Sequence, residues 1–332
     1  MRSVLIVGDH LSGRGGMETI VFKVAKHLND LNEFAGFYFD PRSQDGVISS
    51  DWVQGLHVIP SGNKTAKVFR SFAFVYRLRK FLKQEQSIKK IVCLTPVHCH
   101  LVAKACKDLH QRIEIISWIH FSIDTFRDRE KHYLVESCSR HLAISSGIKK
   151  RLIELGVPEN RCITIYNCTV SHTETLSGLN CEPFTILFMG RVEFNGAKNL
   201  QVLFETLKKF NQNWHLHIVG TGTPVDEKKC RELCQNLGIA KKIFWHGWQS
   251  SPWAYVRKMI GAVNCLVLCS RYEGFPMVLV EALSYGIPCI SSDCPTGPSD
   301  IIENGENGLL YDCADKTGLL TCLEKMYKQG VA

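Results

Sequence analysis

Short apolar runs alternate with amphipathic stretches along the whole chain of 332 residues. Apolar runs of this length are typical of buried strands, and the stretches between them have the periodicity of helices that pack on a sheet. This alternation predicts an α/β fold built on doubly wound, mostly parallel sheets. A chain this long exceeds one ordinary core, so we expect two domains.

In the first half, the predicted strands are Val4–Gly8, Gly36–Phe39, Ile91–Leu94, Ile113–Trp118, Leu142–Ile144 and Ile163–Tyr166. The predicted helices between them are Glu18–Leu28, Thr65–Leu82, Leu101–Leu109 and Ser146–Leu155. Residues 171–183 are polar and lack apolar periodicity. They form the expected linker between a domain of residues 1–170 and a domain of residues 184–332.

The same alternation restarts after the linker. Its predicted strands are Phe184–Met189, His215–Val219, Ile243–Trp245, Val263–Leu268, Pro288–Ser291 and Gly308–Tyr311. Its predicted helices are Leu200–Phe210, Asp226–Leu237, Val278–Tyr285 and Thr317–Tyr327. We therefore expect two Rossmann-like lobes with an interlobe cleft, where ligands bind beyond the carboxyl ends of the strands.

The composition is typical of a globular protein. Hydrophobic residues make up 45% of the chain, and no apolar run reaches the roughly 18 residues of a membrane span. We expect the N-terminus to form a buried strand that Asp9 interrupts rather than a signal peptide, and hence a cytoplasmic protein, at most peripheral on the inner membrane. The 15 cysteines include no CxxC pair, and the cluster His98-Cys99-His100 has no second cluster at zinc spacing. We therefore expect neither a disulfide framework nor a metal site.

Positive charge is concentrated in the first half of the chain. Residues 1–180 contain 25 Lys and Arg against 17 Asp and Glu, whereas residues 181–332 contain 15 of each. Residues 64–90 alone contain nine bases and a single acid, Glu85, with aromatic and aliphatic side chains between the bases. Such a segment suits an amphipathic helix on an anionic membrane surface, and equally an ordinary helix whose apolar stripe faces the core.

Two carboxylates flank a Gly/Pro turn in the segment E-G-F-P-M-V-L-V-E at 273–281. Glu273 lies in the loop after a predicted strand, and Glu281 lies about one turn into the next helix. Gly274 permits close approach of the backbone, and Pro276 begins a helix whose first N–H groups are unpaired. Carboxylates and free N–H groups together can bind the hydroxyls of a ribose or a sugar. The alternative is that one glutamate caps the loop and the other lies on a solvated helix face.

A second loop supplies cations. The strand predicted at 184–189 ends in Gly190, and Arg191 and Lys198 flank the glycine-containing loop that opens the next helix. Two cations at a helix N-terminus favour an anion such as a diphosphate, and plain surface charge is the alternative. Gly220, in V-G-T-G at 219–222, either lets the backbone approach the same ligand or serves a tight turn.

These motifs occur together in one known family. The chain resembles the retaining glycosyltransferases of family 4, which have the two-lobed GT-B fold. The resemblance runs through G-G-M-E-T (15–19), S-W-I-H-F-S (117–122), A-I-S-S-G-I (143–148), G-R…K (190–198) and E-G-F-P-M-V-L-V-E-A-L-S-Y-G-I-P-C-I (273–290). The phrases H-F-S (120–122), G-W-Q…P-W (247–253) and D-C-x-x-G-P-x-D-I-I (293–302) are similar to the bacterial lipopolysaccharide core 1,6-galactosyltransferases.

The resemblance implies a role for each matching residue of the second lobe. Arg191 and Lys198 hold the diphosphate of the donor, and Glu281 binds the ribose hydroxyls. The transferred sugar is bound by Glu273 and by the backbone of the residues that follow it, which are Gly274, Phe275 and Pro276.

Two residues of the first lobe are also implied. Gly16 donates its backbone N–H to the phosphate, and His120 lies beside the donor sugar near the reacting carbon. For His120 the alternative is an interior histidine packed beside Trp118 and Phe121.

The implied reaction moves a hexose, galactose by this resemblance, from a UDP-sugar to a hydroxyl of a lipopolysaccharide core sugar with retention. Side-chain cations stabilise the departing diphosphate, so no metal or other cofactor is expected. The basic first lobe suits a phosphorylated, membrane-anchored acceptor, and no nucleic acid is expected as a partner. Three alternatives stay open. They are a donor that carries glucose or N-acetylglucosamine, a sugar-nucleotide epimerase, and a truncated, catalytically impaired binding protein, because family members usually continue into a further helix.

Overall fold

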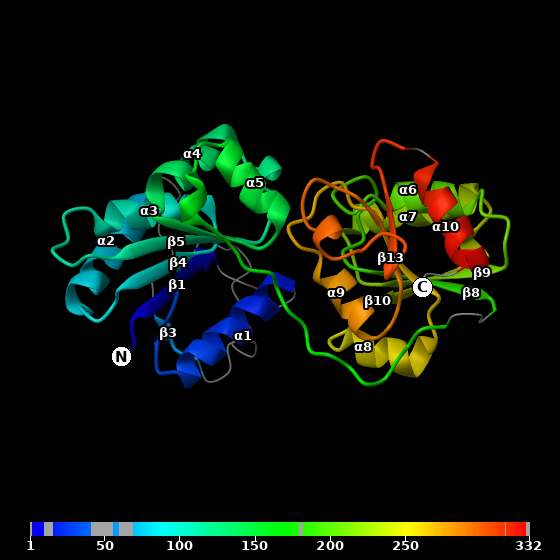
Figure 1. The fold of residues 1–332 in the computed structure, drawn as a ribbon, viewed down its shortest axis with the longest axis horizontal. Coiled ribbons are helices and arrows are strands. Elements are labelled where there is room, and N and C mark those ends of the chain that lie inside the picture. The colour runs from blue at the N-terminus through cyan, green and yellow to red at the C-terminus, as the bar shows by residue number, and fades with distance from the viewer. Residues whose placement is uncertain are drawn as a thin grey trace. The chain divides into compact units, whose positions relative to one another are not determined.

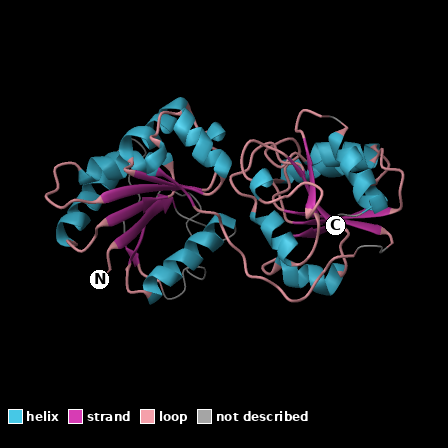
Figure 2. Cartoon of the chain, in the orientation of Figure 1, coloured by secondary structure: helices cyan, strands magenta, loops and turns pink. Residues whose placement is uncertain are grey.

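The computed structural model describes residues 2–9, 16–40, 56–59, 69–178, 182–315 and 317–329. The chain divides into two compact units, Met1–Asn167 and Cys168–Ala332. In each unit helices cover both faces of one parallel sheet, as Figure 1 and Figure 2 show. The predicted α/β class with two Rossmann-like sheets is therefore confirmed.

The sheet of the first unit has seven strands in the order β3-β2-β1-β4-β5-β6-β7. They are β1 (Val4–Asp9), β2 (Phe34–Asp40), β3 (Val58–Ile59), β4 (Lys90–Cys93), β5 (Glu114–Ile119), β6 (Arg140–Ala143) and β7 (Cys162–Thr164). The chain runs outward from β1 to β3 and then continues from β4 to β7 on the other side. The direction of winding therefore reverses between β1 and β4, which is the switch point of this sheet.

Within the described residues of this unit, five α-helices flank the sheet. They are α1 (Gly16–Asp30), α2 (Arg70–Gln84), α3 (Pro96–Cys106), α4 (Asp128–Ser137) and α5 (Ser146–Glu154). Helix α1 lies on one face, and α2 and α3 lie on the other (Figure 1). The buried residues of α2 are Phe74, Leu78 and Leu82, so the apolar stripe of the basic segment does face the core. The start of that segment, residues 60–68 with Lys64 and Lys67, lies outside the described residues.

Helix α3 begins five residues before the position that we predicted. Thr95 is its N-cap, where the side-chain oxygen accepts a hydrogen bond of 3.3 Å from the N–H of His98. Pro96 occupies the first turn, where a missing N–H costs nothing. The prediction of Leu101 as the first residue was wrong because it followed apolar periodicity and overlooked this Thr-Pro cap.

The sheet of the second unit has six strands in the order β10-β9-β8-β11-β12-β13. They are β8 (Phe184–Met189), β9 (Trp214–Val219), β10 (Ile243–Gly247), β11 (Cys265–Leu268), β12 (Cys289–Ser292) and β13 (Gly308–Tyr311). The winding reverses between β8 and β11, so these two neighbours form the switch point.

Helices also cover both faces of the second sheet. They are α6 (Leu200–Leu207), α7 (Pro224–Asn236), α8 (Pro252–Tyr255), α9 (Met277–Ser284) and α10 (Gly318–Gln329). Figure 1 shows α6, α7 and α10 on one side and α8 and α9 on the other. Strand β8 is buried on both faces, because Ile186 and Phe188 belong to one core cluster and Leu187 to the other. A central strand covered on both faces explains the unbroken apolar run in the sequence.

Part of the polar segment at 171–183 packs within the second unit, to which it belongs. The N–H of Leu176 donates to the carbonyl of Tyr285 at 2.9 Å, and the N–H of Gly178 donates to the carbonyl of Val263 at 2.7 Å. These bonds fix residues 176–178 against the end of α9 and the start of β11.

Candidate active site

The loops that follow β8 and β11 leave the second sheet at its carboxyl edge, beside the switch point. Lys198 belongs to the first loop and Glu273 to the second. Their side chains form an ion pair in which Nζ lies 2.5 Å from Oε1. Only 22% of the lysine side chain and 10% of the glutamate side chain are exposed. Two residues predicted from separate motifs thus meet at the position where open α/β sheets bind ligands.

Glu193 organises the loop between β8 and α6. Its side chain accepts hydrogen bonds from the Arg191 guanidinium at 3.2 Å and from the backbone N–H of Lys198 at 3.1 Å. The Arg191 side chain is 73% exposed, so its guanidinium is open to solvent. Asn199 then adopts a left-handed conformation with φ of 50° before α6 begins. Glu193 was not predicted as a site residue, although it lies within the segment between the two cations.

The loop that carries Glu273 is held from two sides. The hydroxyl of Ser270 donates to Oε1 of Glu273 at 2.5 Å, and the hydroxyl of Thr296 donates to its backbone carbonyl. Gly297 has φ of 100°, and a Cβ there would lie 2.7 Å from Cδ of Pro276. A side chain at position 297 would push this loop away, so the close contact needs glycine.

The two loops are also joined through their backbones, because the N–H of Arg271 donates to the carbonyl of Ala197 at 2.8 Å. Helix α9 follows the second loop, with Pro276 at its N-cap. Gly274 and Phe275 are buried just before it. The first N–H groups of α9 lack a carbonyl one turn earlier in the helix, although that of Leu279 donates to the carbonyl of Pro276 at 3.0 Å.

Glu281 lies in α9, on the turn after these donors. Its Oε2 accepts a hydrogen bond of 2.8 Å from the indole Nε1–H of Trp253. Trp253 was not predicted as a site residue, although it lies in the motif G-W-Q…P-W.

Position 220 requires glycine for a structural reason. A Cβ on Gly220 would lie 1.9 Å from the carbonyl oxygen of Gly190, because the loops after β8 and β9 run side by side. The N–H of Gly190 donates to the carbonyl of Val219 at 3.0 Å in the same region. Contact between these loops therefore explains Gly220 without any ligand.

Gly16 and His120 belong to the first unit. Gly16 begins α1, and the preceding residues 10–15 lie outside the described residues. His120 follows β5 and is 8% exposed, with its ring 4.5 Å from the ring of Trp118. Burial lowers the pKa of His120 to about 3. The imidazole is therefore neutral at pH 7, and within the described residues its Nε2 has no hydrogen-bond partner.

The histidines of the cluster at 98–100 point to different neighbours. Nδ1 of His98 lies 2.7 Å from the hydroxyl of Thr95, whereas the ring of His100 stacks on Tyr133 at 3.9 Å. Across the described ranges, no three His, Cys, Asp or Glu side chains gather as a metal site would require.

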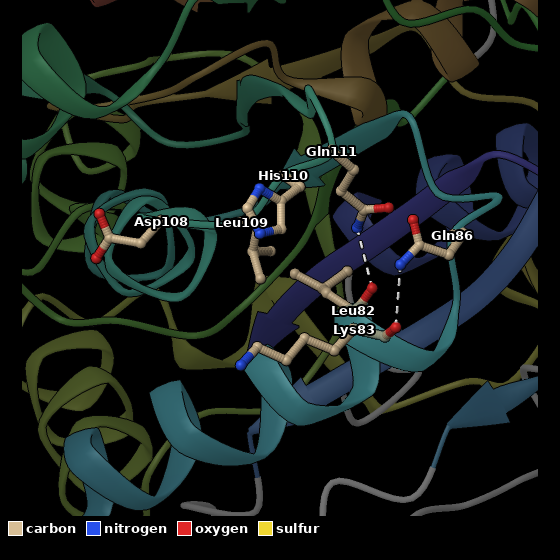
Figure 3. Close-up of a pocket in the computed structure, with 7 residues that line it drawn as sticks. All are labelled: Leu82, Lys83, Gln86, Asp108, Leu109, His110 and Gln111. Carbon is tan, nitrogen blue, oxygen red and sulfur yellow. Dashed lines mark hydrogen bonds between the residues drawn. The ribbon is translucent and has the colours of Figure 1, made fainter.

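A pocket of about 320 Å³ lies elsewhere in the first unit (Figure 3). Residues at the end of α2 and after α3 line it, namely Leu82, Lys83, Gln86, Asp108, Leu109, His110 and Gln111. Both segments lead into the amino ends of strands β4 and β5. The pocket is therefore at the edge opposite to the one where such sheets bind substrates.

Comparison with known proteins identifies the family. Residues 14–170 match the family described as "Glycosyltransferase Family 4", and residues 176–330 match "Glycosyl transferases group 1". The lipopolysaccharide 1,6-galactosyltransferase of Escherichia coli K12 is 36% identical over 325 residues, which are 97% of this chain and 88% of that protein. This chain belongs to the family-4 glycosyltransferases.

Solved structures agree with this membership. The apo form of the lipopolysaccharide outer core galactosyltransferase WaaB is 34% identical and has a TM-score of 0.88, covering 99% of this chain and 91% of that one. Anabaena HepE in complex with UDP-glucose shares the fold, with a TM-score of 0.77 and 17% identity, over 98% of this chain and 90% of that one. The predicted GT-B fold is therefore confirmed for this glycosyltransferase.

Proposed function

We propose that this glycosyltransferase moves galactose from UDP-galactose to a hydroxyl of a lipopolysaccharide core sugar, with retention at the anomeric carbon. The E. coli relative supports the reaction, because its name states lipopolysaccharide 1,6-galactosyltransferase and the match covers 88% of it. The observation in the structure that carries the proposal is the contact of Lys198 with Glu273 at the switch point.

The donor is held by groups with complementary charge. Arg191 and Lys198 bind the diphosphate. Glu281 accepts from the ribose hydroxyls. Glu273 and the backbone of residues 274–276, whose N–H donors are those of Gly274 and Phe275, bind the hydroxyls of the hexose. In this arrangement Glu273 also fixes the direction of the Lys198 ammonium.

The chemical step is a front-face displacement. The bond between the anomeric carbon and the diphosphate oxygen breaks, and its electron pair leaves with UDP. The acceptor hydroxyl oxygen bonds to the same face of that carbon, and its proton passes to the departing phosphate oxygen. The two cations stabilise the charge that grows on the diphosphate, which is the largest contribution expected of the protein. His120, held neutral by burial, can offer a hydrogen bond but no positive charge.

A turnover assay tests this proposal. UDP-galactose, UDP-glucose and UDP-N-acetylglucosamine are each incubated with a truncated core acceptor, and the glycosylated product is quantified by mass spectrometry. We expect transfer from UDP-galactose. If product forms only with one of the other donors, the sugar of that donor replaces galactose in the proposed reaction. UDP release without product, or conversion of one UDP-sugar into its epimer, would contradict a transferase.

We further propose that the first unit docks on an anionic membrane surface through α2, as a peripheral protein on the inner membrane. Among the described helices, none combines the length and the apolar character needed to cross a bilayer. The outward face of α2 nevertheless carries large aromatic side chains. Phe69, Phe72 and Tyr76 are 63%, 78% and 69% exposed.

Helical spacing places these aromatic residues on the side of α2 opposite to its buried stripe, together with Lys80 and Lys83. Residues 69–84 contain no acid. Exposed aromatic rings with lysines around them are typical of helices that lie in the headgroup region of a membrane. An aromatic patch kept in water would be unfavourable, whereas anionic lipids complement the lysines.

Vesicle cosedimentation tests this surface. Phosphatidylcholine vesicles with and without phosphatidylglycerol are compared for the wild type, for Phe72→Ser with Tyr76→Ser, and for Lys80→Gln with Lys83→Gln. We expect each double variant to bind anionic vesicles about tenfold or more weakly, given about 1 kcal/mol for each base near the surface. The control is Val225→Ser, at a 62% exposed apolar residue of the second unit. Unchanged binding by both double variants would exclude this face.

A further inference from the structure

The indole of Trp253 contacts two side chains in or next to α9. Trp253, at the start of α8, donates its Nε1–H to Oε2 of Glu281 at 2.8 Å. The same indole stacks on Tyr285, with ring centroids 5.0 Å apart and planes 28° apart. Glu281 and Tyr285 are four residues apart in or next to α9, so they share one face of that helix. A single side chain therefore contacts both positions.

Further contacts hold Tyr285 in place. The ring of His172 also stacks on Tyr285, with ring centroids 3.9 Å apart and nearly parallel planes. The carbonyl of Tyr285 accepts from the N–H of Leu176 at 2.9 Å and from the hydroxyl of Thr175 at 3.1 Å. Tyr285 itself is 5% exposed. The plane of the Trp253 indole is thus fixed by its neighbours, and the direction of its N–H is fixed with it.

We infer that Trp253 is a positioning residue, which holds the carboxylate of Glu281 in the orientation that the donor ribose needs. The inference rests on the proposed donor site, in which Glu281 binds the ribose diol. A free glutamate side chain samples several rotamers, and ligand binding must then restrict it at a cost in free energy. The charge-assisted bond from Trp253 restricts the carboxylate before the donor arrives. A carboxylate has about four acceptor positions, so it can accept from an indole and from hydroxyls as well.

Calorimetric titrations with two nucleotides test this role. UDP carries the ribose diol, and 2′,3′-dideoxy-UDP lacks it. The variants are Trp253→Phe, Glu281→Gln and the double variant. Phenylalanine keeps an aromatic ring on Tyr285 but removes the N–H. The control is Trp245→Phe, because Trp245 packs with the helices on the opposite face of the sheet.

We expect Trp253→Phe to bind UDP about tenfold more weakly than the wild type, as for the loss of a hydrogen bond to a charged group. Its affinity for the dideoxy nucleotide should stay within about twofold of the wild-type value, because this nucleotide has no diol to bind the carboxylate. The double variant should bind UDP no more weakly than Glu281→Gln alone. Trp245→Phe should bind both nucleotides as the wild type does.

The outcomes separate this inference from the proposal beneath it. If Glu281→Gln binds UDP normally, the proposed donor site is wrong. If Glu281→Gln binds UDP weakly and Trp253→Phe binds it normally, the positioning role alone is wrong. An equal loss of affinity for both nucleotides in Trp253→Phe, with a lower melting temperature, would assign Trp253 to packing and would also overturn the inference.

Discussion

The ammonium of Lys198 lies 2.5 Å from Oε1 of Glu273, although 75 residues separate them in the chain. The loop after β8 supplies the lysine and the loop after β11 supplies the glutamate, and these strands are neighbours at the switch point. The pair gives the proposed donor site a cation for the diphosphate and a carboxylate for the hexose.

This pair predicts opposite effects on binding and on transfer in Glu273→Gln. The amide can still accept from Ser270, but it no longer neutralises Lys198. We expect the variant to bind UDP at least as tightly as the wild type, because the ammonium then faces the diphosphate alone. Transfer should fall by about two orders of magnitude, since the hexose loses a partner needed in the transition state. Loss of UDP binding, measured by calorimetry, would contradict this division of roles.

Substitution of Arg191 should lower the transfer activity without lowering the stability of the fold. Its side chain is 73% exposed and pairs with Glu193, so Arg191→Ala should change the free energy of unfolding by less than about 1 kcal/mol. Transfer should fall about 100-fold or more, because one diphosphate contact is lost. Arg257→Ala is the matched control, since Arg257 is half exposed and pairs with Glu174 at 3.2 Å. Equal activities of the two variants would remove Arg191 from the donor site.

The contact between the loops after β8 and β9 makes Gly220 hard to replace. In Gly220→Ala, the added methyl group would overlap the carbonyl of Gly190, and we expect a loss of about 3 kcal/mol or more in unfolding free energy. Gly238→Ala is the control. Its φ of 70° is also positive, but a Cβ there meets nothing within 4 Å, so its cost should be about 1 kcal/mol. Urea denaturation measures both, and equal costs would mean that the loops separate readily.

Burial of His120 predicts an acid-sensitive contribution to stability. The folded pKa is about 3 and the ordinary value is 6.5, so the unfolded chain binds more protons between these limits. This contribution is complete above pH 6.5 and decreases as the pH falls toward 3, by about 2 kcal/mol at pH 5. Melting temperatures measured from pH 7 to pH 4 should fall less steeply in His120→Gln. A residual slope should remain from His141 and His217, whose pKa values burial lowers to about 4. An unchanged slope in the variant would show that His120 is hydrated.

Much of the fold could be predicted from the sequence because central strands are buried on both faces. Strands β8 and β13 have the predicted bounds. Strand β3 has only two residues, and α4 and α8 bury little, so none of the three produces a clear apolar period. These elements depend on tertiary contacts that no local pattern contains.

Single site residues could be proposed from motifs in the sequence, but their arrangement could not. Lys198 and Glu273 were assigned to different parts of the donor, and their contact depends on strand order, which the sequence does not encode locally. Trp253 was missed for a similar reason, because its bond to Glu281 requires α8 to pack against α9. The need for glycine at position 220 arises from contact with the loop after β8, which no local pattern contains.

Transfer by Lys198→Ala tests the central claim most directly. The rate of galactose transfer from UDP-galactose to a truncated core acceptor is measured for the wild type, for Lys198→Ala and for Lys208→Ala, at an exposed lysine next to the end of α6. The account predicts a fall of about two orders of magnitude or more for Lys198→Ala, with a cooperative melting transition retained, and wild-type transfer for Lys208→Ala. Near-normal transfer by a folded Lys198→Ala protein would contradict the assignment of the donor site to this loop.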